Sequence, residues 1–335
     1  MPDPGPAPGA DTPDAPDDDA ADGPRLDDAE PAGAPRFTVP VGGDDRVDRV
    51  VAARFPASSR RRVVELIEAG GVRVDGRLAR KGDRVAAGAV IELARAPATR
   101  DDLRVTPDPA AAARLTILHV DDALVVMAKP PGMPSQPLRA GELGTAASGL
   151  VALHPECAAV ADDPRDGGLV HRLDRGTSGL LVAARTRAAW QALRAAFADR
   201  RVDKTYLALV EAAPVSRACE APLAQRGRRV VVDHTDGLDA HTAWEVVARL
   251  GARCLVRCTA TTGRMHQVRV HLATCGAPIV GDTLYGGQPL PTLVGFFLHA
   301  EQLTLPTARG PLTIVAPLPP DREATLAALA GDGAS

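Results

Sequence analysis

The sequence predicts an α+β protein with a mixed, largely antiparallel sheet core and flanking helices, preceded by a small α/β domain. From residue 115 onwards, short strand-like segments outnumber helical ones and do not alternate regularly with them, which is typical of this fold class. The chain also lacks a GxGxxG or Walker sequence, so a doubly wound nucleotide-binding fold is not expected. A length of 335 residues suggests two domains more readily than one.

Residues 1 to 36 are rich in Pro, Ala, Gly and Asp and carry almost no bulky side chains. Such a segment cannot bury enough apolar surface to offset its ordering entropy, so we predict a disordered acidic tail. Ten acidic and two basic residues give it a net charge of −8. Because the whole chain carries −3, the remainder carries +5 and is mildly basic. The tail either aids solubility, which we favour, or competes weakly for basic surfaces.

Residues 45 to 95 are predicted to form the small domain. Two helical segments come first, "RVDRVVAARF" ending before Pro56 and "RRRVVELIEAG" ending at Gly70-Gly71; their apolar residues recur at helical spacing. Ser58 or Ser59 can cap the second helix. The hairpin "VRVDGR", with an Asp-Gly turn, and the strand "VIEL" follow.

Basic residues gather around the second helix and the hairpin of this domain: Arg60, Arg61, Arg62, Arg73, Arg77, Arg80 and Lys81. Taken alone, a run of arginines usually marks a solvated charged face. The order helix, helix, hairpin with basic residues at the junction resembles the S4-like (alpha-L) RNA-binding domain. That resemblance implies RNA binding through Arg60, Arg61, Arg62 and Arg73. Phosphate contacts of this kind give affinity and position but little sequence selectivity.

Residues 96 to 114, with many Pro, Ala and Asp, are predicted to be a linker, and residues 115 to 325 form the larger domain. Its predicted strands are "LTILHV", "ALVVMA", "GLLVAA", "TYLALV", "RRVVV", "TAWEVVA" and "CLVRCTA". Its most evident helices are "AAWQALRAAFAD" and "RMHQVRVHLATCG".

Composition excludes several classes of protein. No apolar run approaches the roughly 18 residues of a membrane span, and the N-terminus does not resemble a signal peptide, so we expect a cytoplasmic protein without membrane association. Five cysteines without close CxxC pairs suit a reducing compartment. A zinc site at Cys254 and Cys258 would need further ligands, so we interpret both as core residues and expect no metal.

The stretch "HRLDRGTSGLLVAART", residues 171 to 186, places charged residues directly ahead of an apolar run that must be buried. Either Arg172 and Asp174 are the polar rim of a strand, or the strand is a rigid mount for a reactive Asp174. Further segments that stand out are "KPPGMPSQP", "DKTYLALV", "GRMHQVRVHLA", "GDTLYGG" and "FFLHAEQL". In this order, over residues 115 to 320, they resemble the RluA-type RNA pseudouridine synthases.

The resemblance implies the pseudouridine synthase fold and the isomerisation of uridine in structured RNA. That reaction breaks the N1–C1′ glycosidic bond, turns the uracil and joins C5 to C1′. Nothing is oxidised and no group is carried away, so we expect no cofactor.

By the same resemblance, Asp174 is the catalytic carboxylate. Whether it attacks C1′, adds to C6 or removes the 2′ proton is not decided by the sequence. Arg269 would be its basic partner, since a cation within about 4–6 Å keeps a carboxylate ionised. Taken alone, Arg269 could also be a surface residue of a helix. Tyr206 would stack on the uracil and offer a hydroxyl for proton handling, although a tyrosine in an apolar strand is more often part of a core.

A second set of residues is assigned to RNA or base binding: Arg172, His171, Arg264, His266 and Gln267. The target base must leave its stack, and the resemblance places Arg172 where a guanidinium plane can fill the gap. We expect His171 to orient the loop rather than do chemistry. His266 and His271 are five residues apart on different faces of a helix, so they do not form a metal pair.

Two alternatives stay open on the sequence. One is an RNA-binding or ribosome-associated factor that has lost activity, which would show a replaced Asp174, Tyr206 or Arg269. The other is a carboxylate-based hydrolase, which would need a second carboxylate near Asp174, with Asp199 and Asp203 as the close candidates in sequence. For the synthase, the small domain favours ribosomal RNA of the large subunit as substrate, with transfer RNA as the alternative. We expect a monomer.

Overall fold

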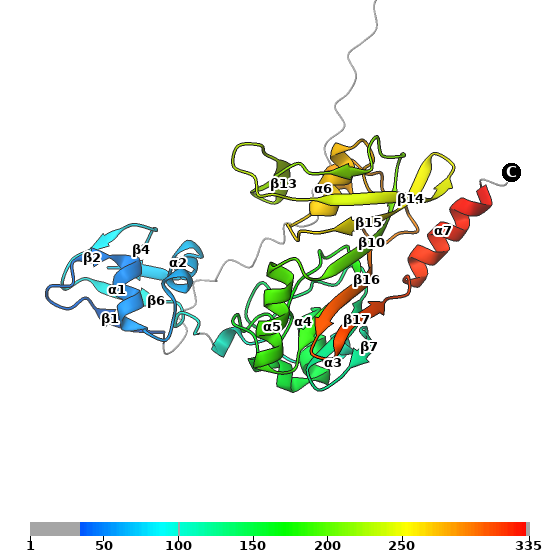
Figure 1. The fold of residues 1–335 in the computed structure, drawn as a ribbon. Coiled ribbons are helices and arrows are strands. Elements are labelled where there is room, and N and C mark those ends of the chain that lie inside the picture. The colour runs from blue at the N-terminus through cyan, green and yellow to red at the C-terminus, as the bar shows by residue number, and fades with distance from the viewer. Residues whose placement is uncertain (1–33, 100, 333–335) are drawn as a thin grey trace, which may run out of the picture. The chain divides into compact units, whose positions relative to one another are not determined.

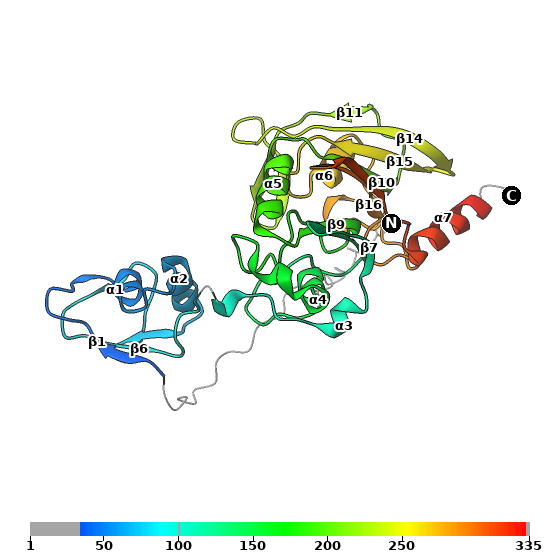
Figure 2. The ribbon, with the colours of Figure 1, turned by 60° about the horizontal axis from the view of Figure 1, so that its bottom comes forward.

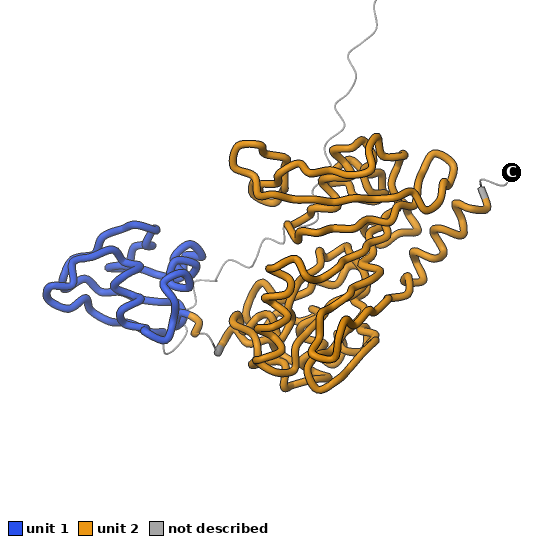
Figure 3. Tube along the Cα trace, viewed as in Figure 1, with its two compact units in different colours: residues 1–97 blue, residues 98–335 orange. Residues whose placement is uncertain are grey.

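The computed structural model of the chain (Figures 1 and 2) describes residues 34–99 and 101–332. The predicted disordered tail therefore lies almost entirely outside the described residues. The chain divides into two compact units, residues 1–97 and 98–335 (Figure 3). In the part that the structure describes, no helix is long and apolar enough to cross a membrane.

The small unit contains the two predicted helices, the hairpin and the last strand, joined by shorter strands. Its sheet has the order β1-β6-β3-β4, and β2 pairs with β5. The elements are β1 (Arg36–Thr38), β2 (Asp45–Arg46), α1 (Val47–Arg54), α2 (Arg60–Glu68), β3 (Val72–Val74), β4 (Arg77–Leu78), β5 (Arg84–Val85) and β6 (Val90–Leu93). Valine, leucine and isoleucine side chains from both helices and the sheet form one core.

Local sequence explains the ends of these elements. Asp75 and Gly76 both have positive φ, 48° and 77°, as the tight turn of the β3–β4 hairpin requires. Gly70, with φ of 74°, ends α2, because a residue in the left-handed conformation lets the following amides bond the last helical carbonyls. Ser59 occupies the predicted N-cap position of α2 but makes no side-chain capping bond, and the Ser58 hydroxyl donates to the carbonyl of Pro97.

Two boundaries differ from the expected ranges. The small unit begins at β1, before residue 45, and the Arg36 side chain pairs with Glu92 on β6. A strand of three residues is too short to show an alternating pattern. The segment 96–114 is not a linker throughout, because Val105 and the short helix α3 (Pro109–Ala112) pack into the core of the larger unit. Asp108 caps α3 and the alanines are small enough to pack closely, although the same composition is typical of linkers.

The larger unit is built on a nine-stranded sheet with the order β11-β14-β15-β10-β16-β9-β8-β7, in which β17 also pairs with β16. Among the strand pairs of the described residues, β16 and β9 alone are parallel, which confirms the mixed, largely antiparallel sheet. The strands are β7 (Thr116–Val120), β8 (Leu124–Lys129), β9 (Ser178–Ala184), β10 (Asp203–Val210), β11 (Ala218–Cys219), β14 (Thr242–Leu250), β15 (Arg253–Ala260), β16 (Leu298–Thr307) and β17 (Gly310–Val315), with a separate hairpin of β12 (Leu223–Arg226) and β13 (Arg229–Val232).

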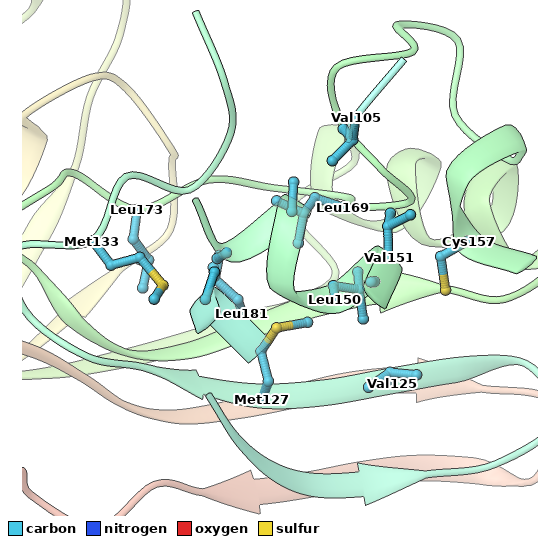
Figure 4. Close-up of a cluster of buried hydrophobic side chains, with 14 of the residues drawn as sticks. Val105, Val125, Met127, Met133, Leu150, Val151, Cys157, Leu169, Leu173 and Leu181 are labelled. Atoms are coloured by element: carbon cyan, nitrogen blue, oxygen red, sulfur yellow. The ribbon is translucent and has the colours of Figure 1, made fainter. Parts of the chain in front are cut away.

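Helices cover both faces of this sheet. The helical elements are η1 (Asp101–Leu103), α3, α4 (Ala146–Leu153), η2 (Pro155–Ala159), α5 (Arg187–Ala198), α6 (Gln267–Thr274), η3 (Thr283–Tyr285) and α7 (Pro320–Asp332). Alternate residues of β8 and β9 face α4 on one side, in the cluster drawn in Figure 4, and α5 on the other. Alternate residues of β10 and β15 likewise face α6 or α7. Cys254 and Cys258 are buried in the cluster under α6, as the sequence predicts.

Candidate active site

The loop that carries Asp174 is anchored on both sides. Leu173 is buried beside Met133 in the core drawn in Figure 4. The Ser135 hydroxyl accepts a hydrogen bond from the Leu173 amide, at 2.9 Å, and donates one to its carbonyl, at 2.7 Å. The amide of Thr177 then donates to the carbonyl of Asp174 and closes a turn before β9. The segment "KPPGMPSQP" therefore supports the loop through Met133 and Ser135.

The strand behind the loop is fixed by close backbone approach. Gly179 has φ of 111°, and a Cβ at this position would lie 2.2 Å from the carbonyl oxygen of Ala300. Only glycine therefore lets β9 pair in parallel with β16. The Ser178 hydroxyl bonds Nδ1 of His299 across the same junction, at 2.9 Å. The loop that carries Asp174 is thus joined to a strand whose position is fixed against β16.

Arg269 joins two carboxylates. Its Nη1 donates to Oδ2 of Asp174 at 2.9 Å, while its Nε and Nη2 donate to the two oxygens of Asp282 at 2.7 and 2.8 Å. The guanidinium also lies over the rings of Phe296 and Tyr285, 4.3 and 5.0 Å from their centroids. Burial alone would lower the pKa of Arg269, but the bonds to Asp282 and the charges of both carboxylates raise it. Arg269 is only 6% exposed, so it is not the surface residue of the alternative interpretation.

Tyr206 lies on β10, with its ring packed between the core under α4 and the core under α6. Burial, assisted by the negative charge of Asp174, raises the pKa of its hydroxyl above the usual range. The phenol is therefore neutral at physiological pH and can donate a hydrogen bond.

His266 precedes α6 with φ of 53°, in the left-handed region that non-glycine residues seldom adopt. Its Nδ1 bonds the hydroxyl of Tyr285 at 2.8 Å, and its Nε2 lies 3.9 Å from Oδ2 of Asp174. Burial lowers the pKa of His266, although the nearby Asp174 opposes this. Burial therefore favours the neutral form of the His266 imidazole beside the Asp174 carboxylate.

These side chains surround a pocket of about 90 Å³. Its lining is formed by the Asp174 loop, the start of β10, the end of β15 and the turn into α6: Arg172, Leu173, Asp174, Thr177, Tyr206, Ala260, Thr262, Gly263, Arg264, His266, Gln267, Val268, Arg269 and Leu298. The structure thus brings together side chains that lie on segments far apart in the sequence. Arg172 is exposed within this lining. Asp199 and Asp203 do not contribute to the lining, so they are poor candidates for a second carboxylate.

Two residues assigned to RNA or base binding are engaged within the protein. His171 accepts a hydrogen bond from the Val182 amide at 3.1 Å and stacks on Phe197, and burial lowers its pKa to about 3. His171 is absent from the pocket lining, and these contacts hold the start of the loop to β9 and α5. The Gln267 amide accepts from Thr262 and the Arg264 amide and donates to the His241 carbonyl and Thr242. It has no donor left for a base and shapes the turn instead.

The arginines of the small unit divide into two groups. Arg60 binds the buried carboxylate of Asp48, and Arg61 and Arg62 bind Glu65. Arg73 donates to the carbonyl of Gly76. Among the described residues, neither Arg73, Arg77 nor Arg80 has a side-chain ion pair. The hairpin arginines are therefore freer to bind phosphates than those of α2.

Sequence reasoning missed Asp282, Tyr285 and Phe296. The first two lie in "GDTLYGG" and the third begins "FFLHAEQL". Both segments stand out in the sequence, but no residue in them was assigned a role. Asp282 is 2% exposed and Phe296 8%. Their contribution depends on packing against Arg269, which no local pattern reveals.

Comparison with known proteins identifies the family to which the chain belongs. Residues 123–274 match the family model described as RNA pseudouridylate synthase, and residues 45–91 match the S4 domain. Together with the relatives below, these matches show that the chain belongs to the RNA pseudouridine synthase family, in its RluA type with an N-terminal S4 domain. It is an isomerase that acts on RNA.

Among its relatives are two proteins named ribosomal large subunit pseudouridine synthase D. The one from Xanthomonas campestris is 38% identical over 307 residues, covering 86% of this chain and 90% of that protein. The one from Xylella fastidiosa is 40% identical over 318 residues, covering 89% and 93%. Among solved structures, human RNA pseudouridylate synthase domain containing 4 is 26% identical, with a TM-score of 0.53, over 66% of this chain and 94% of that chain.

Proposed function

We propose that this chain converts a uridine of large-subunit ribosomal RNA into pseudouridine, and that it works in the cytoplasm as a monomer. The S4 domain and the names of the Xanthomonas and Xylella relatives support this substrate. Transfer RNA is the alternative that the experiment below must exclude.

In this proposal Asp174 is the catalytic carboxylate. The observation that carries it is the ion pair with Arg269 in a pocket that also holds Tyr206. The Arg269 guanidinium orients the Asp174 carboxylate in the pocket, where it can act as a nucleophile or base. Attack at C1′, addition to C6 and removal of the 2′ proton all require a carboxylate fixed in such a position.

The rest of the pocket fits an extruded uracil. Tyr206 offers a ring for stacking and a neutral hydroxyl for hydrogen bonding. Arg172 is exposed within the lining and is free to fill the gap that the base leaves in the RNA. Extrusion costs a few kcal/mol, which phosphate contacts from the S4 domain offset.

The test is a map of pseudouridines in ribosomal and transfer RNA from a strain with the gene deleted and from its parent. Pseudouridine has the mass of uridine, so carbodiimide adducts that stop reverse transcriptase provide the detection. We expect one or more sites in large-subunit RNA to disappear and to return when the wild-type gene, but not the Asp174→Asn gene, is supplied. Loss confined to transfer RNA would overturn the proposed substrate, and loss of no site would overturn the proposed function.

A further inference from the structure

Arg322, on α7 near the C-terminal end of the chain, is an unusual core residue. It is 0% exposed and is among the largest fully buried side chains in the described part of the protein. It does not line the pocket and belongs to none of the segments that the sequence singled out. Full burial is unusual for an arginine, so the groups that Arg322 contacts must account for it.

The Arg322 guanidinium ties together two segments of the active site. Its Nη2 donates to the carbonyl of Gly176 at 3.0 Å and to the carbonyl of Phe296 at 2.8 Å. Its Nη1 donates to Asp321 at 2.9 Å. One nitrogen thus bridges two backbone segments that are 120 residues apart in sequence.

Each bridged segment controls one partner of the Asp174–Arg269 ion pair. Gly176 lies two residues after Asp174, inside the turn that sets the direction of the carboxylate. The Phe296 ring lies under the Arg269 guanidinium, 4.3 Å from it, and against Gly176, where a Cβ would come within 2.5 Å of the ring. A shift of either segment would change the geometry between carboxylate and guanidinium.

Stability alone does not explain a charge at this place. Removing a guanidinium from water costs several kcal/mol unless it is fully paired. The carboxylate of Asp321 is its only ionic partner among the described residues, and the buried Nε makes no hydrogen bond. Burial accordingly lowers the pKa of Arg322. Replacing a buried ion pair by well-packed apolar side chains is often neutral or stabilising. The feature that requires an arginine here is the pair of hydrogen bonds to the carbonyls of Gly176 and Phe296.

We propose that Arg322 is a positioning residue for catalysis, through which α7 sets the geometry between Asp174 and Arg269. The proposal rests on the catalytic role of Asp174 given above. Arg322 touches no substrate in it and acts only through Gly176 and Phe296.

The test compares Arg322→Met with Leu326→Ala, a control on the same helix. Leu326 packs against the core under α7, and its apolar side chain makes no hydrogen bond to Gly176 or Phe296. Each variant is measured for melting temperature, for dissociation constant with a substrate RNA transcript, and for the single-turnover rate with enzyme saturating. Because a misplacement of about 1 Å can cost on the order of a hundredfold in rate, we expect Arg322→Met to lose about tenfold or more. Its RNA affinity should stay within about threefold, since no phosphate or base contact is removed.

Leu326→Ala should lower the melting temperature but leave the single-turnover rate within about twofold of the parent, because the bridge persists. Arg322→Lys, which keeps the charge but only part of the bridge, should fall between Arg322→Met and the parent, and it serves as the test if Arg322→Met does not fold. A parental rate in Arg322→Lys and Arg322→Met, or equal rate losses in Arg322→Met and Leu326→Ala at equal melting temperature, would overturn the proposal. Turnover by Asp174→Asn would instead overturn the proposed catalytic role of Asp174.

Discussion

Nη1 of Arg269 lies 2.9 Å from Oδ2 of Asp174, while the other donors of the same guanidinium hold Asp282. The arginine is thus fixed by a carboxylate that is itself buried, and it presents a single donor to the carboxylate in the pocket. Asp174 is therefore oriented without being enclosed, since its side chain keeps 20% of its exposure. This arrangement leads to separate predictions for the two partners.

Asp174→Asn preserves the size of the side chain and its bond from Arg269 but removes the charge and the nucleophile. We expect a melting temperature close to that of the parent, RNA binding within several-fold, and no detectable pseudouridine. The matched control is Asp203→Asn, on the exposed start of β10, which should retain parental turnover. The readout is carbodiimide mapping after incubation with RNA, with protein checked for deamidation. Conversion by Asp174→Asn above about a hundredth of the parental rate would mean that Asp174 is not the reagent.

Arg269→Ala should affect stability and activity together. It leaves the buried Asp282 without its cation, so we expect the free energy of unfolding to fall by roughly 3–5 kcal/mol. The double variant Arg269→Ala/Asp282→Asn should recover part of that loss, because no unpaired charge remains, but should recover no turnover. Denaturant titration and single-turnover assays separate the two effects. Arg269→Lys should be milder than Arg269→Ala, since the charge remains and only the planar fork is lost. Recovered turnover in the double variant would show that Arg269 acts only on stability.

The sequence could predict the strands that support this site but not all of the contacts between its side chains. β9 is buried throughout and contains only apolar or small residues, and β8 and β10 each contain a buried apolar run, so all three were evident as strands. The convergence of Asp174, Tyr206 and Arg269 followed from resemblance, since residues on three separate elements have no common periodicity. Asp282 and Arg322 could not be assigned a role, because a lone charged residue normally lies on the surface and only tertiary packing buries it.

RNA affinity in the S4 domain should depend more on the hairpin arginines than on those of α2. Arg73 and Arg77 have no acidic partner among the described residues, whereas Arg61 is paired with Glu65. Arg73→Ala and Arg77→Ala should each reduce the slope of log affinity against log salt by about 1. Arg61→Ala should reduce it less, because the Arg61 guanidinium is already paired with Glu65. Filter binding at several salt concentrations gives these slopes. Equal changes for all three variants would contradict the distinction.

Lys129 should make the stability of the fold depend on pH above neutrality. Its ammonium is 1% exposed and donates to the carbonyls of Pro130, Met133 and Arg175. Burial, and next the positive charge of Arg322, lower the pKa of Lys129 from 10.5 to about 7. The unfolded chain therefore holds a proton that the folded protein releases between these two values.

It follows that the contribution of Lys129 to the free energy of unfolding rises as pH increases from about 7 towards 10.5, and is constant and most unfavourable below about 7. Lys129→Met has no group to titrate, so it should lack this increase. Denaturant unfolding of both proteins at pH 6, 7, 8 and 9 isolates the effect, because every other titrating group is shared. The stability of the parent relative to Lys129→Met should rise between pH 7 and 9. A difference that does not change with pH would show that the ammonium stays charged among its three carbonyls throughout this range.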